Sequence, residues 1–184
     1  PVLVVALILL GGGVALADEW SDISDSTWVS TYKVTPQQAA AVSDGFTDGT
    51  FRPMQAVTRG QFAKFVVDGF GISKANPAVA TFKDVSKTST FYVWIEGGVD
   101  AGVISGFTDN TYRPNSTISR QQSNSILGKY LSNKELAQKG SIRGATGGSY
   151  TTLNTWYAAE GAAILQQFSD RGSINEVHRP GTAY

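Results

Sequence analysis

The sequence predicts a mainly α-helical fold made of helix-loop-helix repeats, with short extended segments between the helices. The first observation is an internal repeat: residues 45–53 read GFTDGTFRP and residues 106–114 read GFTDNTYRP, an offset of 61. The second is the helix-start pattern that follows each copy, TRGQ at 58–61 and SRQQ at 119–122, which has the form of a capping box. A fixed period of this length is typical of repeat architectures, whose units bury their apolar faces against one another.

The first unit reads as helix, turn and helix. Residues 35–38 (TPQQ) form a capping box with proline at the first helical position, so a helix is expected from there to about Val42. Asp48-Gly49 predicts a tight turn in which the glycine takes a left-handed conformation. The helix that opens at residue 58 has an apolar face made of Phe62, Phe65, Val66 and Phe70.

The second unit repeats this plan. Residues 82–85 (FKDV) correspond to residues 20–23 (WSDI), and Asn110, the next-best residue for a left-handed position, replaces the turn glycine. Phe51 and Tyr112 mark short extended segments after the two turns. The helix that opens at residue 119 carries Ile126, Leu127, Tyr130 and Leu131, and Ser132-x-x-Glu135 predicts one more short helix.

A third unit is more divergent. Phe168-Ser169-Asp170 echoes the aromatic-x-Asp part of the turn, but the rest of the turn motif is missing. Arg59, Arg120 and Arg179 nevertheless fall 61 and 59 residues apart. We therefore divide the chain into residues 18–75, 76–133 and a partial third unit at 134–184.

The first seventeen residues carry no charge and end in Ala15-Leu16-Ala17, a cleavage-site pattern. They fit the apolar region of a signal peptide, and a retained N-terminal membrane anchor is the alternative. Both readings place the rest of the chain outside the cytoplasm.

Composition excludes several classes of function. Lys+Arg and Asp+Glu are balanced at 15 each, which argues against general nucleic-acid binding. The chain has no cysteine and only one histidine, His178, so disulfides, thiolate sites and multi-histidine zinc sites are excluded. No metal or cofactor is expected.

The recurring arginine needs an explanation. A cation in the first turn of a helix faces the positive end of the helix dipole, which costs roughly 0.3–1 kcal/mol. One explanation is an ion pair with a turn carboxylate, Asp48 or Asp109. The other is an external anion held by the guanidinium group and free backbone N–H groups.

One tryptophan occurs in each unit: Trp28, Trp94 and Trp156. Aromatic residues at such positions belong to the core more often than not. Indole rings also stack on the apolar faces of sugars, so a role in lining a ligand groove is the second interpretation.

The enzyme class is disfavoured. A catalytic triad would have to use His178, which stands where Thr58 and Ser119 cap their helices, so a helix-entry role is favoured. The recurring aspartates are more simply turn residues than a glycosidase pair. A calcium loop starting at Asp44 fails because Phe46 and Gln55 occupy ligand positions.

The repeats resemble the S-layer homology family. The matching features are the aromatic-x-Asp-hydrophobic start, the tryptophan, the turn at 45–53 and 106–114, and the Thr-Arg helix start, although Gln61 and Gln122 replace the usual glutamate. The resemblance implies a pseudo-threefold helical bundle whose grooves bind pyruvylated secondary cell-wall polysaccharide. It also implies a set of ligand-binding residues: Arg59, Arg120 and Arg179 at helix starts, Asp48, Gly49 and Asp109 in turns, and Trp28 and Trp94 in grooves.

By this resemblance the chain is expected to be a non-catalytic anchoring module at the cell wall or cell surface. Its partners would be the wall polysaccharide and other envelope proteins, with a membrane involved only if residues 1–17 are retained. Two alternatives stay open: a membrane-tethered protein–protein interaction subunit of a larger assembly, and the anchoring part of an exported hydrolase.

Overall fold

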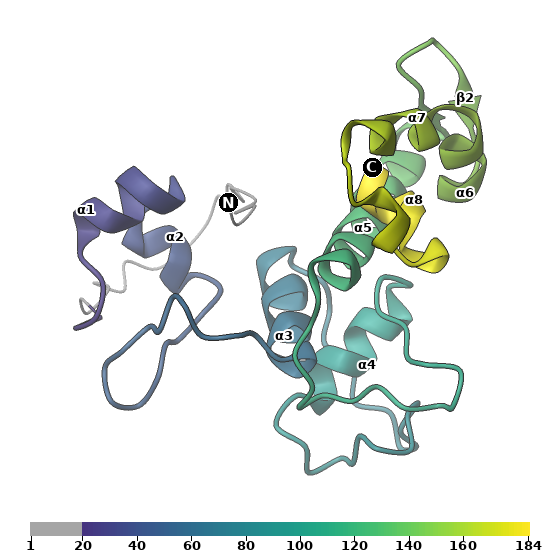
Figure 1. The fold of residues 1–184 in the computed structure, drawn as a ribbon. Coiled ribbons are helices and arrows are strands. Elements are labelled where there is room, and N and C mark those ends of the chain that lie inside the picture. The colour runs from purple at the N-terminus through teal and green to yellow at the C-terminus, as the bar shows by residue number, and fades with distance from the viewer. Residues whose placement is uncertain (1–19) are drawn as a thin grey trace.

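The computed structural model describes residues 20–184, so the predicted signal or anchor segment at 1–17 lies outside the described residues. Within 20–184 the fold is mainly helical with one small antiparallel sheet, which confirms the predicted class (Figure 1). The helices are α1 Asp25–Thr27, α2 Pro36–Ala40, α3 Arg59–Gly69, α4 Tyr92–Asp100, α5 Arg120–Lys139, α6 Leu153–Trp156, α7 Ala162–Ile164 and α8 Arg179–Ala183. The strands are β1 Ile142–Arg143 and β2 Ser149–Tyr150.

Short irregular helical turns extend several of these elements. Trp28–Tyr32 and Tyr157–Gly161 form π-helical turns after α1 and α6. Three 3₁₀ turns lie in the C-terminal part, at Leu165–Gln167, Arg171–Ser173 and Glu176–His178. Among residues 20–184 no helix is both long and apolar enough to cross a membrane.

The capping boxes at the starts of α2, α3 and α5 are confirmed. At α3 the Thr58 hydroxyl accepts a hydrogen bond from the Gln61 amide at 3.2 Å, and the Gln61 side chain accepts one from the Thr58 amide at 2.9 Å. The separate short helix predicted at Ser132 is wrong. Helix α5 runs through that position without a break and ends at Gly140, which has φ +73° and so forms a left-handed cap.

Each turn motif is tied to the aspartate that starts its unit. Asp84 accepts hydrogen bonds from the backbone amides of Tyr112 at 2.8 Å and Arg113 at 2.7 Å. Asp22 accepts from the equivalent amides of residues 51–52, both at 2.7 Å. The aromatic-x-Asp motif therefore holds the far side of its own turn in both units.

Three apolar clusters lie within residues 20–184. The first unit has its own cluster around Ile23, Trp28, Val34 and Ala39. The largest cluster joins α3 to the second unit, because Ala63 and Val66 pack with residues of α4, α5 and the second turn. The third gathers Ile142, Trp156, Leu165 and Ala183. The second helix of the first unit is thus buried against the next unit; the unit boundaries and a threefold bundle remain predictions.

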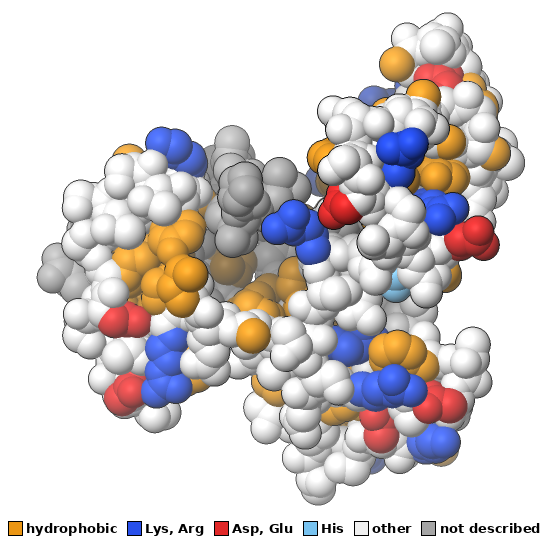
Figure 2. Space-filling model, in the orientation of Figure 1, with side chains coloured by type: hydrophobic (Ala, Val, Ile, Leu, Met, Phe, Trp, Pro, Cys, Tyr) orange, Lys and Arg blue, Asp and Glu red, His pale blue; other side chains and the backbone are white. Residues whose placement is uncertain are grey.

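The surface agrees with the balanced charge of the chain. Figure 2 shows Lys and Arg side chains interspersed with Asp and Glu side chains, and no broad basic face in that view. Apolar side chains gather over the first unit, where α1 and α2 lie in Figure 1.

Candidate functional site

Arg59 begins α3 but its side chain lies in the turn of the second unit. It is only 5% exposed. Its Nε donates to the carbonyl oxygen of Tyr112 at 2.7 Å, and its Nη2 lies 3.4 Å from the carbonyl oxygen of Ser105. The guanidinium carbon also lies 4.8 Å from the ring centre of Phe107 and 4.5 Å from that of Tyr112. The Arg59 side chain therefore joins the first unit to the second.

The backbone around Arg59 reinforces the same junction. The amides of Arg59 and Gly60 donate to the carbonyl oxygens of Ser116 and Pro114, each at 2.8 Å. The amide of Ile118 donates to the carbonyl oxygen of Val57 at 3.0 Å. Thr58 and Thr117 form an antiparallel bridge at the centre of this pairing. Residues 57–60 of the first unit thus pair with residues 114–118 of the second.

Of the two explanations for the helix-start arginine, an ion pair with a turn carboxylate does not hold for Arg59. Asp48 is bonded instead to Arg52 at 2.6 Å, and Asp109 to Arg113 at 2.9 Å. Each aspartate thus pairs with the arginine four residues further along its own turn, at the surface. Within residues 20–184 no carboxylate oxygen lies within 4.0 Å of the Arg59 guanidinium.

The predicted turn residues build the turns. Asp48 accepts hydrogen bonds from the Thr50 hydroxyl at 2.6 Å and from the Thr50 amide at 3.1 Å. The Thr50 hydroxyl and then Arg52 lower the pKa of Asp48 to about 2, and Thr111 and Arg113 do the same for Asp109. Gly49 has φ +77° and Asn110 φ +62°, which confirms the left-handed positions.

A second cation meets Arg59 at Ser105. Lys129, on α5, lies with its Nζ 3.3 Å from the Ser105 hydroxyl, while Arg59 Nη2 faces the carbonyl of the same residue. Lys129 has no ion pair within the described part of the chain either. Burial lowers the pKa of both groups, and for Arg59 this is opposed by Tyr112 and, at longer range, by Asp84.

The single histidine lies in the 3₁₀ turn Glu176–His178, which packs against α5, the helix of Lys129. His178 stands at the entry to α8, as predicted, but its side chain makes no capping hydrogen bond. Its Nδ1 is buried and has no hydrogen-bond partner among residues 20–184. Burial first, and then the positive charges of Lys129 and Arg59, lower its pKa. We call Arg59 and Lys129, together with the uncharged ring of His178, the cationic cluster.

The three helix-start arginines are not equivalent. Arg120 is exposed, and its side chain makes no hydrogen bond or ion pair within residues 20–184. Arg179 is half-buried and already occupied: its Nε donates to the carbonyl oxygen of Ile174 at 3.1 Å, and its Nη1 lies 3.6 Å from Glu176. Only Arg59 belongs to the cationic cluster.

The predicted groove tryptophans also differ from one another. Trp28 is 4% exposed and packs edge-on against Phe51, so its place is the first-unit core and not a ligand groove. Trp94 is half-buried on α4 and donates from Nε1 to Asp68 at 2.9 Å. Lys74 lies 4.8 Å from the Trp94 ring centre and covers one of its faces.

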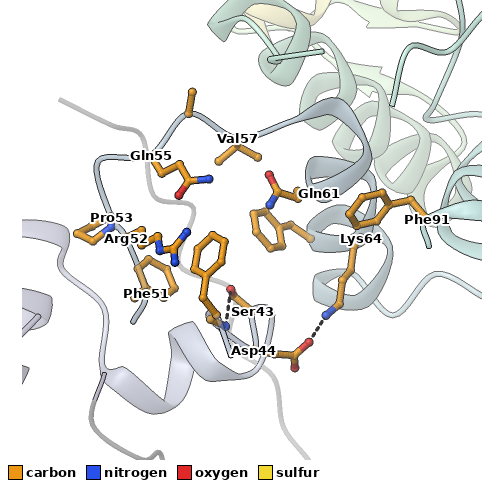
Figure 3. Close-up of a pocket in the computed structure, with 14 residues that line it drawn as sticks. Ser43, Asp44, Phe51, Arg52, Pro53, Gln55, Val57, Gln61, Lys64 and Phe91 are labelled. Atoms are coloured by element: carbon orange, nitrogen blue, oxygen red, sulfur yellow. Dashed lines mark hydrogen bonds and ion pairs between the residues drawn. The ribbon is translucent and has the colours of Figure 1, made fainter. Parts of the chain in front are cut away.

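A separate pocket of about 250 Å³ lies beside the first turn (Figure 3). Its cations are neutralised, because Lys64 is ion-paired with Asp44 and Arg52 with Asp48. Phe91, at the start of α4, closes the side away from the turn. Among the residues described, no group of three or more acidic, histidine or cysteine residues could hold a metal ion.

Comparison with known proteins bears on this arrangement. The S-layer homology domain family matches residues 37–63 and 81–122, which include both turns and the start of α3. The chain is 29% identical over 131 residues to a cellulosome-anchoring protein and 25% identical over 142 residues to cell surface glycoprotein 1, both of Acetivibrio thermocellus. It is 30% identical over 103 residues to an endoglucanase of a Bacillus species.

These matches cover 68%, 72% and 56% of this chain but only 27%, 6% and 10% of the three relatives. The chain therefore corresponds to a small part of much longer proteins. The family and the cell-surface relatives indicate a location at the cell surface. Taken with the repeated turns and capped helices, they show that the chain carries S-layer homology repeats over these residues and is similar to cellulosome-anchoring and cell-surface proteins.

Proposed function

We propose that this cell-surface anchoring module binds an acidic, pyruvylated secondary cell-wall polysaccharide through the cationic cluster. The observation that carries the proposal is the meeting of Arg59 and Lys129 at Ser105, with no carboxylate partner for either among residues 20–184. Partly buried positive charges without a counterion are costly, and an anion from outside would offset that cost. A carboxylate on a sugar is such an anion.

The roles within the cluster differ. The Arg59 side chain is held by its contacts with Tyr112 and Phe107, so its positive charge stays in one position and acts on the ligand from there. Lys129 is half-buried on a different helix, and among residues 20–184 the three donors of its Nζ have only the Ser105 hydroxyl as partner. His178 adds a ring nitrogen without a partner. We assign direct contact with the acidic group to Lys129. The Nδ1 of His178 is buried, so we expect the pKa of this ring to respond to the bound charge without direct contact through that atom.

The pocket beside the first turn is a weaker candidate for an acidic ligand. It is lined by aromatic side chains and by Arg52 and Lys64, but both cations are already paired with aspartates. An incoming carboxylate would have to displace one of these pairs. Exposed Arg120 and the half-buried Trp94 stay in the proposal as secondary contacts with the polymer, and Arg179 does not, because its guanidinium is occupied.

The test replaces Lys129 with methionine, which keeps the length of the side chain and removes its charge. Lys134→Met on the same helix is the matched control, because Lys134 is exposed. Binding of the full chain to purified wall sacculi should weaken about tenfold in Lys129→Met, a loss of about 1.4 kcal/mol. The control should bind like the wild type, and sacculi stripped of the acidic polysaccharide should bind neither. Equal binding by both variants would overturn the assignment of the cluster.

The relatives motivate a second, compatible proposal about cargo. One relative is a cellulosome-anchoring protein and another is an endoglucanase, and the chain covers only a small part of each. We infer that this module is non-catalytic and that it positions a larger exported protein, such as a hydrolase, at the cell surface. Release of sugars from wall glycan by the purified chain would contradict the non-catalytic assignment.

A further inference from the structure

The contact between Arg59 and the second turn has an unfilled counterpart in the first turn. The two turns repeat at an offset of 61, so each carbonyl oxygen of the second turn that binds residues 59–60 has a counterpart in the first turn. Pro114 and Ser116 correspond to Pro53 and Gln55. The carbonyl oxygens of Pro53 and Gln55 accept no hydrogen bond from any residue in 20–184, whereas their counterparts are both occupied.

The side-chain acceptors repeat the same difference. Arg59 uses the carbonyl oxygens of Ser105 and Tyr112, which correspond to those of Asp44 and Phe51. Neither of the latter accepts a hydrogen bond within the described chain. The pocket of about 250 Å³ in Figure 3 is bounded by these residues and by Phe46, the counterpart of Phe107. We call residues 44–57 the open turn.

The matching donor is also unfilled. Arg120 corresponds to Arg59, is exposed, and begins a capped helix in the same way. Its backbone amide and that of Gln121 have no acceptor within residues 20–184, whereas the amides of Arg59 and Gly60 are bonded to the second turn. Within residues 20–184, one copy of the chain therefore has one filled junction, one open turn and one unused helix start.

The third unit of the same chain does not supply the missing arginine. The side chain of Arg179 is held by Ile174 and Glu176, and its backbone amide donates to the carbonyl oxygen of Glu176. We propose that two copies associate head to tail, with the helix start at Arg120 of one copy seated in the open turn of the next. The filled junction at Arg59 serves as the template for this contact.

Two features set the character of this association. The donor and the acceptor surfaces are different parts of the chain, so the contact is heterologous and repeats from copy to copy, either as a closed ring or as an open row. The open turn has Phe51 where the second turn has Tyr112, whose hydroxyl donates to the Arg59 carbonyl at 3.0 Å. The contact between copies lacks this hydrogen bond, so it should be weaker than the internal junction and reversible.

Disulfide trapping tests the register directly, because the chain has no cysteine. The bridged pair Thr58 and Thr117 corresponds to Ser119 of one copy and Ala56 of the next. Residues paired across an antiparallel bridge are close enough for a disulfide. Mixing the full-length variants Ala56→Cys and Ser119→Cys under mild oxidation should give mainly the mixed dimer. Met54→Cys, which is exposed on the same segment, replaces Ala56→Cys as control and should give little.

Sedimentation of the full chain, without wall material, provides the second test. The average mass of the wild-type particles should rise with protein concentration. This rise should be lost in Arg120→Met and kept in Arg143→Met, a substitution at another exposed arginine. Association through the apolar residues 1–17 would be common to both variants. Equal yields of mixed and control disulfides, or equal association of the two arginine variants, would overturn the proposal. Both tests are made without wall polymer, for which Arg120 is only a secondary contact, and binding to that polymer is tested separately by Lys129→Met.

Discussion

Arg59 donates from Nε to the carbonyl oxygen of Tyr112 at 2.7 Å, across 53 residues of sequence. The Tyr112 hydroxyl returns a hydrogen bond to the Arg59 carbonyl at 3.0 Å. This reciprocal pair fixes the start of α3 inside the turn of the next unit. It also explains why a cation is retained at a helix N-terminus, where the helix dipole disfavours it.

Arg59→Met should destabilise the chain, because the Tyr112 and Ser105 carbonyl oxygens would lose a charged donor inside the junction. Hydrogen bonds to charged groups contribute about 1.5–3 kcal/mol, and the loss in the free energy of unfolding should fall in that range. Chemical denaturation measures it. Arg120→Met is the control and should stay within about 0.5 kcal/mol of wild type, because Arg120 is exposed. Similar losses for both variants would show that the Arg59 side chain does not hold the two units together.

Asp84→Ala should loosen the second turn. Its carboxylate accepts from the amides of Tyr112 and Arg113, and alanine would leave both amides without that partner. We expect a loss of about 1.5–3 kcal/mol in the free energy of unfolding. Faster hydrogen exchange at these two amides is the local signature. Asp100→Ala, at an exposed position at the end of α4, should leave their exchange unchanged.

The two turns should also weaken together in strong acid. The pKa of Asp48 and that of Asp109 are both lowered to about 2, from an ordinary value of 3.8. A lowered carboxyl pKa contributes stability that is present above pH 3.8 and is lost as the pH falls through about 2. Carbon-13 titration of the two carboxyl groups measures these values directly. Ordinary values near 3.8 would contradict the Thr-Asp-Arg geometry of the turns.

Gly128→Ala should detach the C-terminal helix. A β-carbon at residue 128 would lie 2.4 Å from the carbonyl oxygen of Gly181, where α8 packs closely on α5. Overpacking of this kind costs about 1–3 kcal/mol. Gly140→Ala, by contrast, meets no atom within 4 Å but is strained by its positive φ. Loss of the tertiary signal of Trp156, with the α3–α4 core intact, is the expected result for Gly128→Ala.

The local features of the fold could be predicted from the sequence. The capping boxes and the left-handed turn positions depend on residues at most three apart, so their patterns were sufficient. The pattern Ser132-x-x-Glu135 looks like the start of a new helix, so the sequence does not predict one continuous α5. Residues 129–139 nevertheless contain neither glycine nor proline, so nothing in that stretch breaks the helix. The partners of Asp48 and Asp109 were missed although an arginine recurs four residues after each of them.

The cationic cluster could not have been predicted in the same way. Arg59, Lys129 and His178 come from three different units. Arg59 and Lys129 meet at Ser105 because α3 docks on the second turn, and the 3₁₀ turn that holds His178 packs on α5. Lys129 carries no repeat signal, since unit-to-unit spacing places Asp68 at the corresponding position of the first unit. His178 was recognised as a helix-entry residue, but its unpartnered nitrogen is a property of the packing.

The most direct measurement of the central claim uses the only histidine of the chain. Its imidazole proton signals can be followed by NMR while pH is varied, without ambiguity of assignment. In the free chain the pKa of His178 should lie below 6.5, because burial and two neighbouring cations disfavour its charge. A soluble pyruvylated wall saccharide should raise that pKa, because its carboxylate would stabilise the protonated ring. Saturating binding of the saccharide with no change in the pKa of His178 would contradict the assignment of the ligand site to the cationic cluster.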